Sequence, residues 1–261
     1  MHDVFFFTDT HGRKDLFDSM RTWCYEQDPN CTIIFGGDAA DRGPDGYNIM
    51  KILLFDPQII YLKGNHEDMF VNAARALKHK VSKDHKYTYE EAKTVIRYAY
   101  SRDDDIFLAC ENGARPTLIS YIMDGAPIEI VEEIDKLPTA FRYNNIDFCH
   151  AGYTPEGFKN MYEDEFAKVP PHDTFAKEGI IWDRKHLEDS WAEGRICVFG
   201  HTPVQYLRLP KYDIYPSDYR TTPTKWANKI DMDTGMVFSN VGYVLNVHTL
   251  QTIQFEWTKE E

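Results

Sequence analysis

Residues 2–12 read HDVFFFTDTHG, an apolar run that stops at a polar cluster containing glycine. The run from His2 to Phe7 predicts a buried strand, because short apolar runs bounded by turn residues are typical of strands inside a sheet. Asp9 and His11 follow the carboxyl end of this strand, where both can reach one ion while Thr10 points elsewhere. The stretch therefore predicts a sheet with a binding site at its edge.

Two further apolar runs end in the same way. Thr32–Phe35 stops at Gly-Gly-Asp, and Ile59–Leu62 stops at Lys-Gly-Asn-His-Glu. The segments between the runs, Lys14–Tyr25 and Asp45–Leu54, have helical character. This order of strands and helices predicts an α/β sheet with crossover helices. In such sheets ligands bind beyond the carboxyl ends of the strands.

The pattern becomes helical from about Met69 to Leu137, where Pro127 opens one predicted helix over Ile128–Lys136. Short apolar runs then predict strands over Ile146–Cys149, Ile196–Phe199, Val204–Leu209, Val237–Ser239, Tyr243–Val247 and Thr252–Trp257. We expect a single domain over residues 1–261 with a helical insertion at about 78–137.

The composition argues against several classes of protein. The 261 residues carry a formal net charge of −13, which disfavours binding to a nucleic-acid backbone or an anionic membrane surface. No apolar run reaches the roughly 18 residues of a membrane span, and the sequence does not begin like a secretory signal. Five cysteines without a C-x-x-C pair predict reduced, mostly buried thiols. We expect a soluble, cytoplasmic protein.

Six side chains of metal-ligand type lie at the ends of predicted strands. They are Asp9, His11, Asp38, Asn65, His150 and His201. Any one of them alone is as readily a cap or a hydrogen-bonded core residue. Their joint occurrence beside glycines, which let the backbone approach a ligand closely, favours a metal centre. Carboxylate, amide and imidazole ligands without thiolate suit manganese, iron or zinc rather than a structural zinc site.

Five motifs carry a resemblance to a known family. They are Asp9-Thr10-His11-Gly12, Gly37-Asp38-Ala39-Ala40-Asp41-Arg42-Gly43, Gly64-Asn65-His66-Glu67, His150-Ala151-Gly152 and Gly200-His201-Thr202-Pro203. On these motifs the chain resembles the phosphoprotein phosphatase family, the serine/threonine phosphatase branch of the calcineurin-like metallophosphoesterases. It is most similar to the bacterial and phage members, including the diadenosine tetraphosphatase subgroup. The resemblance implies an α/β sandwich of mixed β-sheets flanked by helices.

The resemblance also implies two divalent cations, with Mn²⁺ as the first expectation and Fe or Zn as alternatives. The implied ligands are Asp9, His11 and a bridging Asp38 for one cation, and Asp38, Asn65, His150 and His201 for the other. Two cations about 3.5 to 4 Å apart would hold a bridging hydroxide that attacks phosphorus in line. No phosphoenzyme is then needed.

The remaining motif residues are implied to handle the substrate. Arg42 and Arg184 are the implied phosphate clamps, because a guanidinium pairs with two phosphoryl oxygens at once, and Asn65 is also expected to contact substrate. His66 is the implied general acid for the leaving group, with Asp41 hydrogen-bonded to its other ring nitrogen.

The chain departs from the family pattern at Thr8, where glycine is usual. The tyrosine found near the active site of eukaryotic relatives has no counterpart that can be placed in this sequence. Asp233-Thr234-Gly235 resembles a short stretch that bacterial members carry after the last histidine. None of these features removes an implied metal ligand.

We predict hydrolysis of phosphate monoesters on a phosphorylated protein or a small phosphorylated substrate, first of all as a serine/threonine phosphoprotein phosphatase. A diadenosine tetraphosphatase-like hydrolase is the alternative. A catalytically silent scaffold is less favoured, because every implied ligand, His66 and both arginines are present. Diesterase branches carry Gly-His-x-His, but Pro203 stands at the second histidine here. The oligomeric state stays open.

The insertion at about 78–137 connects two strands whose carboxyl ends both contribute to the predicted site. Insertions at such a rim commonly set selectivity, whereas the metals and arginines supply chemistry that is indifferent to the leaving group. We expect a partial cap that narrows access, with Tyr87–Arg102 on its inward face.

Overall fold

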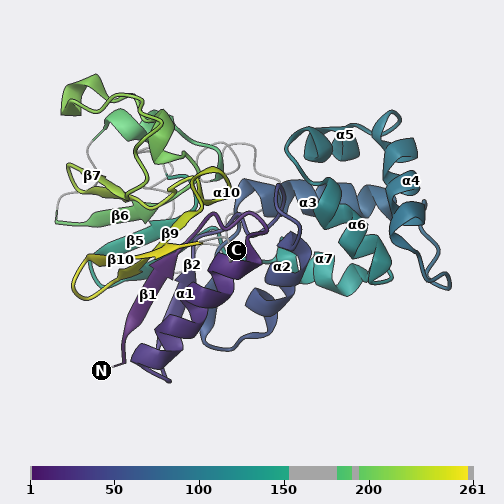
Figure 1. The fold of residues 1–261 in the computed structure, drawn as a ribbon, viewed down its shortest axis with the longest axis horizontal. Helices are drawn as coiled ribbons and strands as arrows, with labels where there is room; N and C mark the ends of the chain where they lie inside the picture. Colours follow the sequence, from purple (N-terminus) through teal and green to yellow (C-terminus); the bar gives the residue numbers. More distant parts are fainter. Residues whose placement is uncertain (1, 153–180, 190–193, 258–261) are drawn as a thin grey trace.

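The computed structural model describes residues 2–152, 181–189 and 194–257, which form two five-stranded sheets (Figure 1). The first sheet has the order β10-β9-β1-β2-β3. Its strands are β1 (Val4–Phe7), β2 (Thr32–Phe35), β3 (Ile59–Tyr61), β9 (Val241–Asn246) and β10 (Gln251–Glu256). As predicted, β1, β2 and β3 run parallel, so their carboxyl ends share one edge.

The second sheet has the order β4-β5-β6-β8-β7. Its strands are β4 (Ala140–Tyr143), β5 (Ile146–Cys149), β6 (Ile196–Phe199), β7 (Thr224–Trp226) and β8 (Lys229–Asp231). Strands β5, β6 and β8 are parallel, whereas β4 and β7 are antiparallel to their neighbours. The parallel centre again brings several strand ends together.

The alternation of side chains along β1 explains how the layers pack. Phe6 faces the second sheet, where its ring stacks on Phe148 with the centroids 5.2 Å apart, inside a buried cluster between the sheets. Phe5 and Phe7 point to the opposite face, into a second cluster. That cluster includes helices α1 (Lys14–Gln27) and α2 (Gly46–Phe55). The predicted sandwich of mixed sheets flanked by helices is confirmed.

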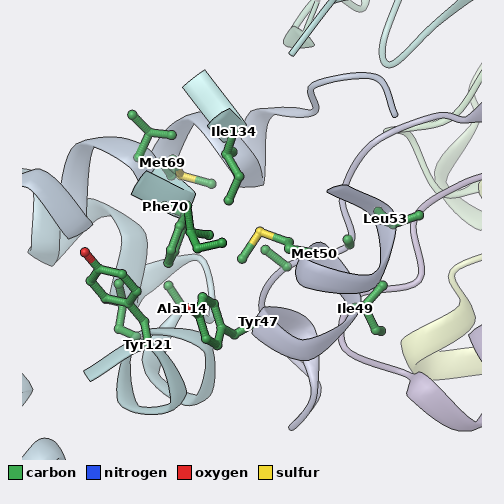
Figure 2. Close-up of a cluster of buried hydrophobic side chains, with 14 of the residues drawn as sticks. Tyr47, Ile49, Met50, Leu53, Met69, Phe70, Ala114, Tyr121 and Ile134 are labelled. Atoms are coloured by element: carbon green, nitrogen blue, oxygen red, sulfur yellow. The ribbon is translucent and has the colours of Figure 1, made fainter. Parts of the chain in front are cut away.

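The region between β3 and β4 is helical, as the periodicity predicts. Its helices are α3 (Asn65–Leu77), α4 (Tyr89–Tyr100), α5 (Asp104–Glu111), α6 (Arg115–Met123) and α7 (Ile128–Asp135). Figure 2 shows Tyr121 of α6 beside Phe70 of α3 and Tyr47 of α2, with ring centroids 5.4 and 5.7 Å away. The insertion therefore shares its core with the helices that follow β2 and β3.

One predicted strand, Val204–Leu209, is wrong because its apolar residues pack without pairing in a sheet. The segment begins with a 3-10 turn, η3 (Val204–Tyr206). Val204, Leu207 and Leu209 are buried with Trp226 against the outer face of the second sheet. Two further short 3-10 turns among the described residues are η2 (Lys185–Glu188) and η4 (Pro210–Tyr212).

A second predicted strand, Val237–Ser239, lies instead in the short helix α10 (Met236–Ser239). Gly235 and Asn240 flank this helix, and both have a positive φ, of 62° and 58°. A left-handed residue turns the chain sharply at each end, which favours a single helical turn over an extended segment.

Strand β8 was not predicted, because its charged residues are not typical of a strand inside a sheet. Lys229 and Asp231 are buried, and the Lys229 ammonium donates hydrogen bonds to the backbone carbonyls of His186 and Asp189. A buried ammonium with such partners satisfies its donors, so a central strand can carry it. Sequence periodicity alone does not reveal these partners.

Two predictions from composition can be compared with the described residues. All five cysteines are free and buried, as expected. Among the described helices, none has the length and apolar character needed to cross a membrane.

Candidate metal centre and active site

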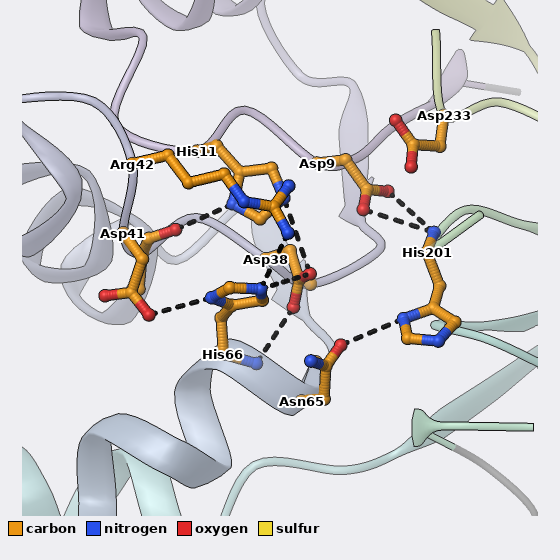
Figure 3. A network of polar contacts seen from close by, with 12 residues as sticks. Asp9, His11, Asp38, Asp41, Arg42, Asn65, His66, His201 and Asp233 are labelled. Carbon is orange, nitrogen blue, oxygen red and sulfur yellow. Dashed lines mark hydrogen bonds and ion pairs between the residues drawn. The ribbon is translucent and has the colours of Figure 1, made fainter. Parts of the chain in front are cut away.

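Loops from both sheets meet at one edge of the sandwich (Figure 3). Asp9 and His11 follow β1, Asp38 follows β2, and Asn65 is the first residue of α3 after β3. The remaining two predicted ligands, His150 and His201, follow β5 and β6 of the second sheet. All six side chains are buried. The fold thus places all six predicted ligands at this edge, although Asp9 belongs to neither of the two groups of closely spaced ligand atoms described next.

Two groups of side chains have the spacing of metal-ligand sets. His11, Asp38 and His66 form one group, and Asp38, His150 and His201 form the other, with the candidate ligand atoms of each group within 4.8 Å of one another. Asp38 belongs to both. Its Oδ2 lies 3.6 Å from His11 Nε2, and its Oδ1 lies 3.3 Å from His150 Nε2. This position fits the predicted bridging role.

Asn65 and His201 complete the second group. Asn65 Oδ1 lies 3.0 Å from His150 Nε2 and 2.9 Å from His201 Nδ1. The other ring nitrogen of His201, Nε2, is buried and has no hydrogen-bond partner within the described ranges. Nδ1 is therefore the ring nitrogen of His201 that faces Asn65 and His150, and it is the one that could share a cation with them.

The orientations of His11 and His150 also suit metal binding. His11 Nδ1 lies 2.9 Å from the carbonyl oxygen of Ala40, and His150 Nδ1 lies 2.9 Å from that of Gly36. If each Nδ1–H donates to its carbonyl, the tautomer is fixed and the Nε2 lone pair is directed into the site. Metal-ligating histidines are commonly oriented in this way.

The backbone of the site is strained. Asp9, His11, Asp38 and His201 all have a positive φ, between 43° and 70°. Each such non-glycine residue costs on the order of 1–3 kcal/mol, and these conformations cluster at active sites. Hydrogen bonds between the loops hold them, including His11 N–H to the Asp38 carbonyl at 3.0 Å. The sequence gives no sign of this strain.

Glu67 supports the loop that follows β2, a role that the sequence did not reveal. Its buried carboxylate accepts hydrogen bonds from the backbone N–H groups of Asp38, Ala39 and Gly64, each at 2.8 Å, and from Ala40 at 3.3 Å. One side chain therefore holds the loop that presents Asp38 and also the start of α3. The only hint in the sequence is that Glu67 follows directly on Asn65-His66.

We expect Glu67→Gln to lower the free energy of unfolding by about 3 kcal/mol, because an amide must turn its NH₂ group toward one of these backbone donors. Chemical denaturation would measure the change, and elemental analysis would show weakened metal retention. Glu91→Gln is the matched control, since Glu91 accepts from Thr88 N–H at 2.8 Å in an exposed capping box. Equal losses in the two variants would contradict the role of Glu67.

Thr8 adds a hydrogen bond to the site where glycine is usual in the family. Its hydroxyl donates to Asp9 Oδ2 at 2.7 Å, and the Asp9 carboxylate also accepts the backbone N–H of His201, 3.1 Å from its Oδ1. The unusual residue therefore helps to orient a predicted ligand.

Several buried carboxylates lie close together in the site and shift the pKa values of their neighbours. Burial, reinforced by the nearby Asp233, raises the pKa of Asp9 well above its ordinary value. Burial by itself would lower the pKa of His150, but Asp38, Asp9 and Glu67 outweigh it and raise this pKa to about 10. Buried carboxylates that keep an imidazole protonated also favour the binding of a cation. The donor set thus fits the implied divalent metals.

His66 and Asp41 form the predicted acid pair. His66 Nδ1 lies 2.8 Å from Asp41 Oδ2, and both side chains are buried (Figure 3). Burial would lower the pKa of His66, but the carboxylates of Asp38 and Asp41 outweigh it and raise the pKa above its ordinary value. The imidazole is thereby poised to hold a proton beside Asp38, whose Oδ2 is 3.8 Å from His66 Nε2.

The two predicted clamps contact different residues of the site. Arg42 reaches between two imidazoles, with Nη1 2.6 Å from His11 Nε2 and Nη2 3.1 Å from His66 Nε2. A metal on His11 requires the same lone pair, so the guanidinium must rotate away from it when a cation binds. Arg184 is exposed, and its Nε donates to Thr202 Oγ1 at 3.1 Å.

The family model for calcineurin-like phosphoesterases matches residues 2–215. The chain belongs to the calcineurin-like phosphoesterase family. The resemblance drawn from the five motifs is therefore confirmed, and so is the expectation of a phosphoester hydrolase. Divalent metals are used throughout this family, and the described residues contain candidate ligands for them.

Solved structures show the same fold with varied activities. A crystal structure provisionally assigned as a diadenosine tetraphosphatase is 17% identical, with a TM-score of 0.57, covering 98% of this chain and 94% of its own. A cold-active protein-tyrosine phosphatase from a Shewanella species is 16% identical, with a TM-score of 0.55 and coverages of 97% and 77%. A comparison with curated proteins found no match.

A yeast protein serine/threonine phosphatase, from Saccharomyces cerevisiae and similar to human PP5, is 17% identical to this phosphoesterase. It has a TM-score of 0.50 and covers 100% of this chain and 81% of its own. At these identities the likeness establishes the fold, while the named activities of the three proteins differ from one another.

Proposed function

We propose that this phosphoesterase hydrolyses phosphate monoesters, with phosphoserine and phosphothreonine proteins as its substrates. The observation that carries the proposal is the His66–Asp41 pair beside Asp38, the residue shared by both candidate ligand groups. An alkyl alcohol leaves as a poor alkoxide unless it receives a proton, and a positioned imidazole supplies one. Pro203, in place of the additional histidine of diesterase branches, supports the same choice.

Two divalent cations, for which we propose Mn²⁺, would neutralise phosphoryl charge and activate the attacking water when bound. Asp9, His11 and Asp38 would hold one of them. The second would be held by Asp38, Asn65, His150 and His201. The absence of thiolate donors from this set supports manganese over a structural zinc ion.

The other side chains would act on the substrate directly. Arg42 and Arg184 would bind phosphoryl oxygens from two sides, and Asn65 would contribute a further polar contact. His66 would give its Nε2 proton to the leaving oxygen, while Asp41 keeps the proton on Nδ1 and fixes the ring. Five buried free thiols suit a reducing compartment, so we also propose a cytoplasmic location.

The substrate class is tested by comparing rates of hydrolysis side by side. The substrates are one peptide sequence carrying phosphoserine, phosphothreonine or phosphotyrosine, together with diadenosine tetraphosphate, each with added Mn²⁺. We expect the highest kcat/KM on phosphoserine or phosphothreonine. A preference for diadenosine tetraphosphate would instead establish the second candidate, which the 0.57 TM-score to a structure provisionally assigned to that activity favours.

We expect Arg42→Ala and Arg184→Ala to lower kcat/KM by about 10- to 100-fold, because each removes a charged hydrogen bond to phosphate. Both variants should keep their metal and should be inhibited less by inorganic phosphate. Arg195→Ala is the matched control, since Arg195 pairs with Asp147 at 2.5 Å outside the site. An Arg184→Ala enzyme with wild-type kinetics would remove Arg184 from the clamp.

A further inference from the structure

Asp41 and Arg42, which would serve the acid pair and the phosphate clamp, have consecutive positive φ values of 70° and 64°. Two such residues in sequence need contacts that hold them, because the left-handed region is unfavourable for both side chains. The conformation also decides where the two side chains point. The partners of their backbone N–H groups therefore matter for the chemistry.

Both partners come from the helical insertion. The N–H of Asp41 donates to the hydroxyl oxygen of Thr117 at 2.9 Å, and the N–H of Arg42 donates to the carbonyl oxygen of Gly113 at 3.0 Å. We call residues 112–117, which join α5 to α6 and begin α6, the α5–α6 connection. Two successive contacts to one short segment set both the position and the direction of the Asp41–Arg42 backbone.

The α5–α6 connection is itself closely fitted. Thr117 is fully buried, and Gly113 has a φ of +99° that favours glycine. A Cβ on Gly113 would lie 3.0 Å from Arg42 Cγ and 3.1 Å from Arg42 N. On the other side, a Cβ on Gly46 would come within 2.9 Å of the Thr117 hydroxyl and 2.8 Å of Asp41 N.

Helix α6 fixes the connection to the protein core. Leu118 and Ile122 are fully buried in the cluster that also contains Phe70 of α3, and Tyr121 packs edge-on against Phe70. Helix α3 begins at Asn65 and His66. One packed unit therefore carries both the His66 imidazole and the Thr117 hydroxyl that contacts the backbone of its carboxylate partner, Asp41. The connection therefore cannot shift freely relative to His66.

We propose that the α5–α6 connection positions the catalytic groups, with Thr117 setting the Asp41–His66 pair and Gly113 setting Arg42. This inference rests on the proposed function. It assigns the insertion a part in proton delivery and phosphate binding, in addition to the partial cap that we expect from its location. Thr117 and Gly113 are positioning residues and do not contact the substrate.

The first test uses Thr117→Val, which keeps the shape of the side chain and removes the acceptor for Asp41 N–H. We expect kcat on a phosphoserine peptide to fall about tenfold more than kcat on p-nitrophenyl phosphate, whose leaving group departs without a proton. KM and metal content should stay near wild type. Thr117→Ser, which keeps the hydroxyl, should restore the wild-type ratio of the two rates.

A matched control is available in Thr139, whose buried hydroxyl has no hydrogen-bond partner among the residues described. Thr139→Val should leave the ratio of the two rates unchanged. An equal loss on both substrates in Thr117→Val, or the wild-type ratio, would overturn the role of Thr117.

Gly113→Ala tests the second half of the proposal, and its outcome does not depend on whether Thr117→Val folds. We expect a higher KM and about tenfold weaker inhibition by inorganic phosphate, with no change in the leaving-group ratio. An unchanged inhibition constant overturns the positioning of Arg42. A wild-type enzyme that is inactive on every phosphate monoester overturns the proposed function as well, so the two failures are distinguishable.

Discussion

Replacing Asp38 by Asn is expected to reduce the bound divalent metal from two ions toward one or none. It should also lower kcat by about 10³-fold or more, because metal-supplied charge stabilisation is worth several kcal/mol. Asp38 lies 3.6 Å from His11 Nε2 and 3.3 Å from His150 Nε2, so its negative charge is shared by both candidate sites. An amide has the same shape but cannot offset the repulsion between two cations. Elemental analysis and turnover of p-nitrophenyl phosphate would measure the two effects.

Asp56→Asn controls for the loss of a carboxylate elsewhere. Asp56 follows α2 and pairs with Arg21 at 2.6 Å, away from the strand ends that form the site. Its replacement should leave metal content and turnover near wild type. An Asp38→Asn enzyme that keeps two ions and full activity would refute the bridging assignment.

His66→Asn should lower kcat by about 10² to 10⁴ on an alkyl phosphate such as a phosphoserine peptide. The loss should be far smaller on p-nitrophenyl phosphate, because p-nitrophenolate is stable without a proton. The reason lies in the geometry, since Asp41 holds Nδ1 at 2.8 Å and leaves Nε2 to face the site. Rates on the two substrates, measured at equal metal loading, give the comparison.

Two outcomes would contradict the assignment of His66 as the acid. Equal losses on both substrates would mean that the imidazole acts on a step that precedes departure of the leaving group. Loss of metal would mean that His66 is a ligand, which its place in one candidate ligand group with His11 and Asp38 makes a direct alternative.

The sequence was sufficient to predict the parallel strands and the residues at their ends. Buried parallel strands are apolar along their whole length, so Val4–Phe7 and Thr32–Phe35 are easily recognised, and the first polar residues after them fall at the edge. Because β1 and β2 are parallel neighbours, Asp9, His11 and Asp38 can be placed at the same edge from the sequence alone. Strand β8 was not predicted, because charged residues such as Lys229 and Asp231 are typical of the surface and their buried partners cannot be inferred from the sequence.

What the sequence could not predict depends on contacts between distant residues. Glu67 reaches a loop 29 residues earlier, and Thr117 reaches Asp41 across 76 residues. Neither residue type has a pattern that signals such a contact, since both glutamate and threonine also occur on the exposed surfaces of helices. The left-handed conformation of Asp41 and Arg42 follows from these contacts and not from local propensity, which would disfavour it.

Because the candidate ligands come from two sheets, the supply of metal should affect how much of the protein stays folded in the cell. Asp9, on the first sheet, accepts the backbone N–H of His201 from the second, so the ligands assemble only when the sheets are docked. Any cation that binds this arrangement and not the unfolded chain stabilises it by about 1.4 kcal/mol for each tenfold excess over its dissociation constant. In a cell starved of that metal, more of the newly made protein would be exposed to proteases, and its abundance would follow the metal pool.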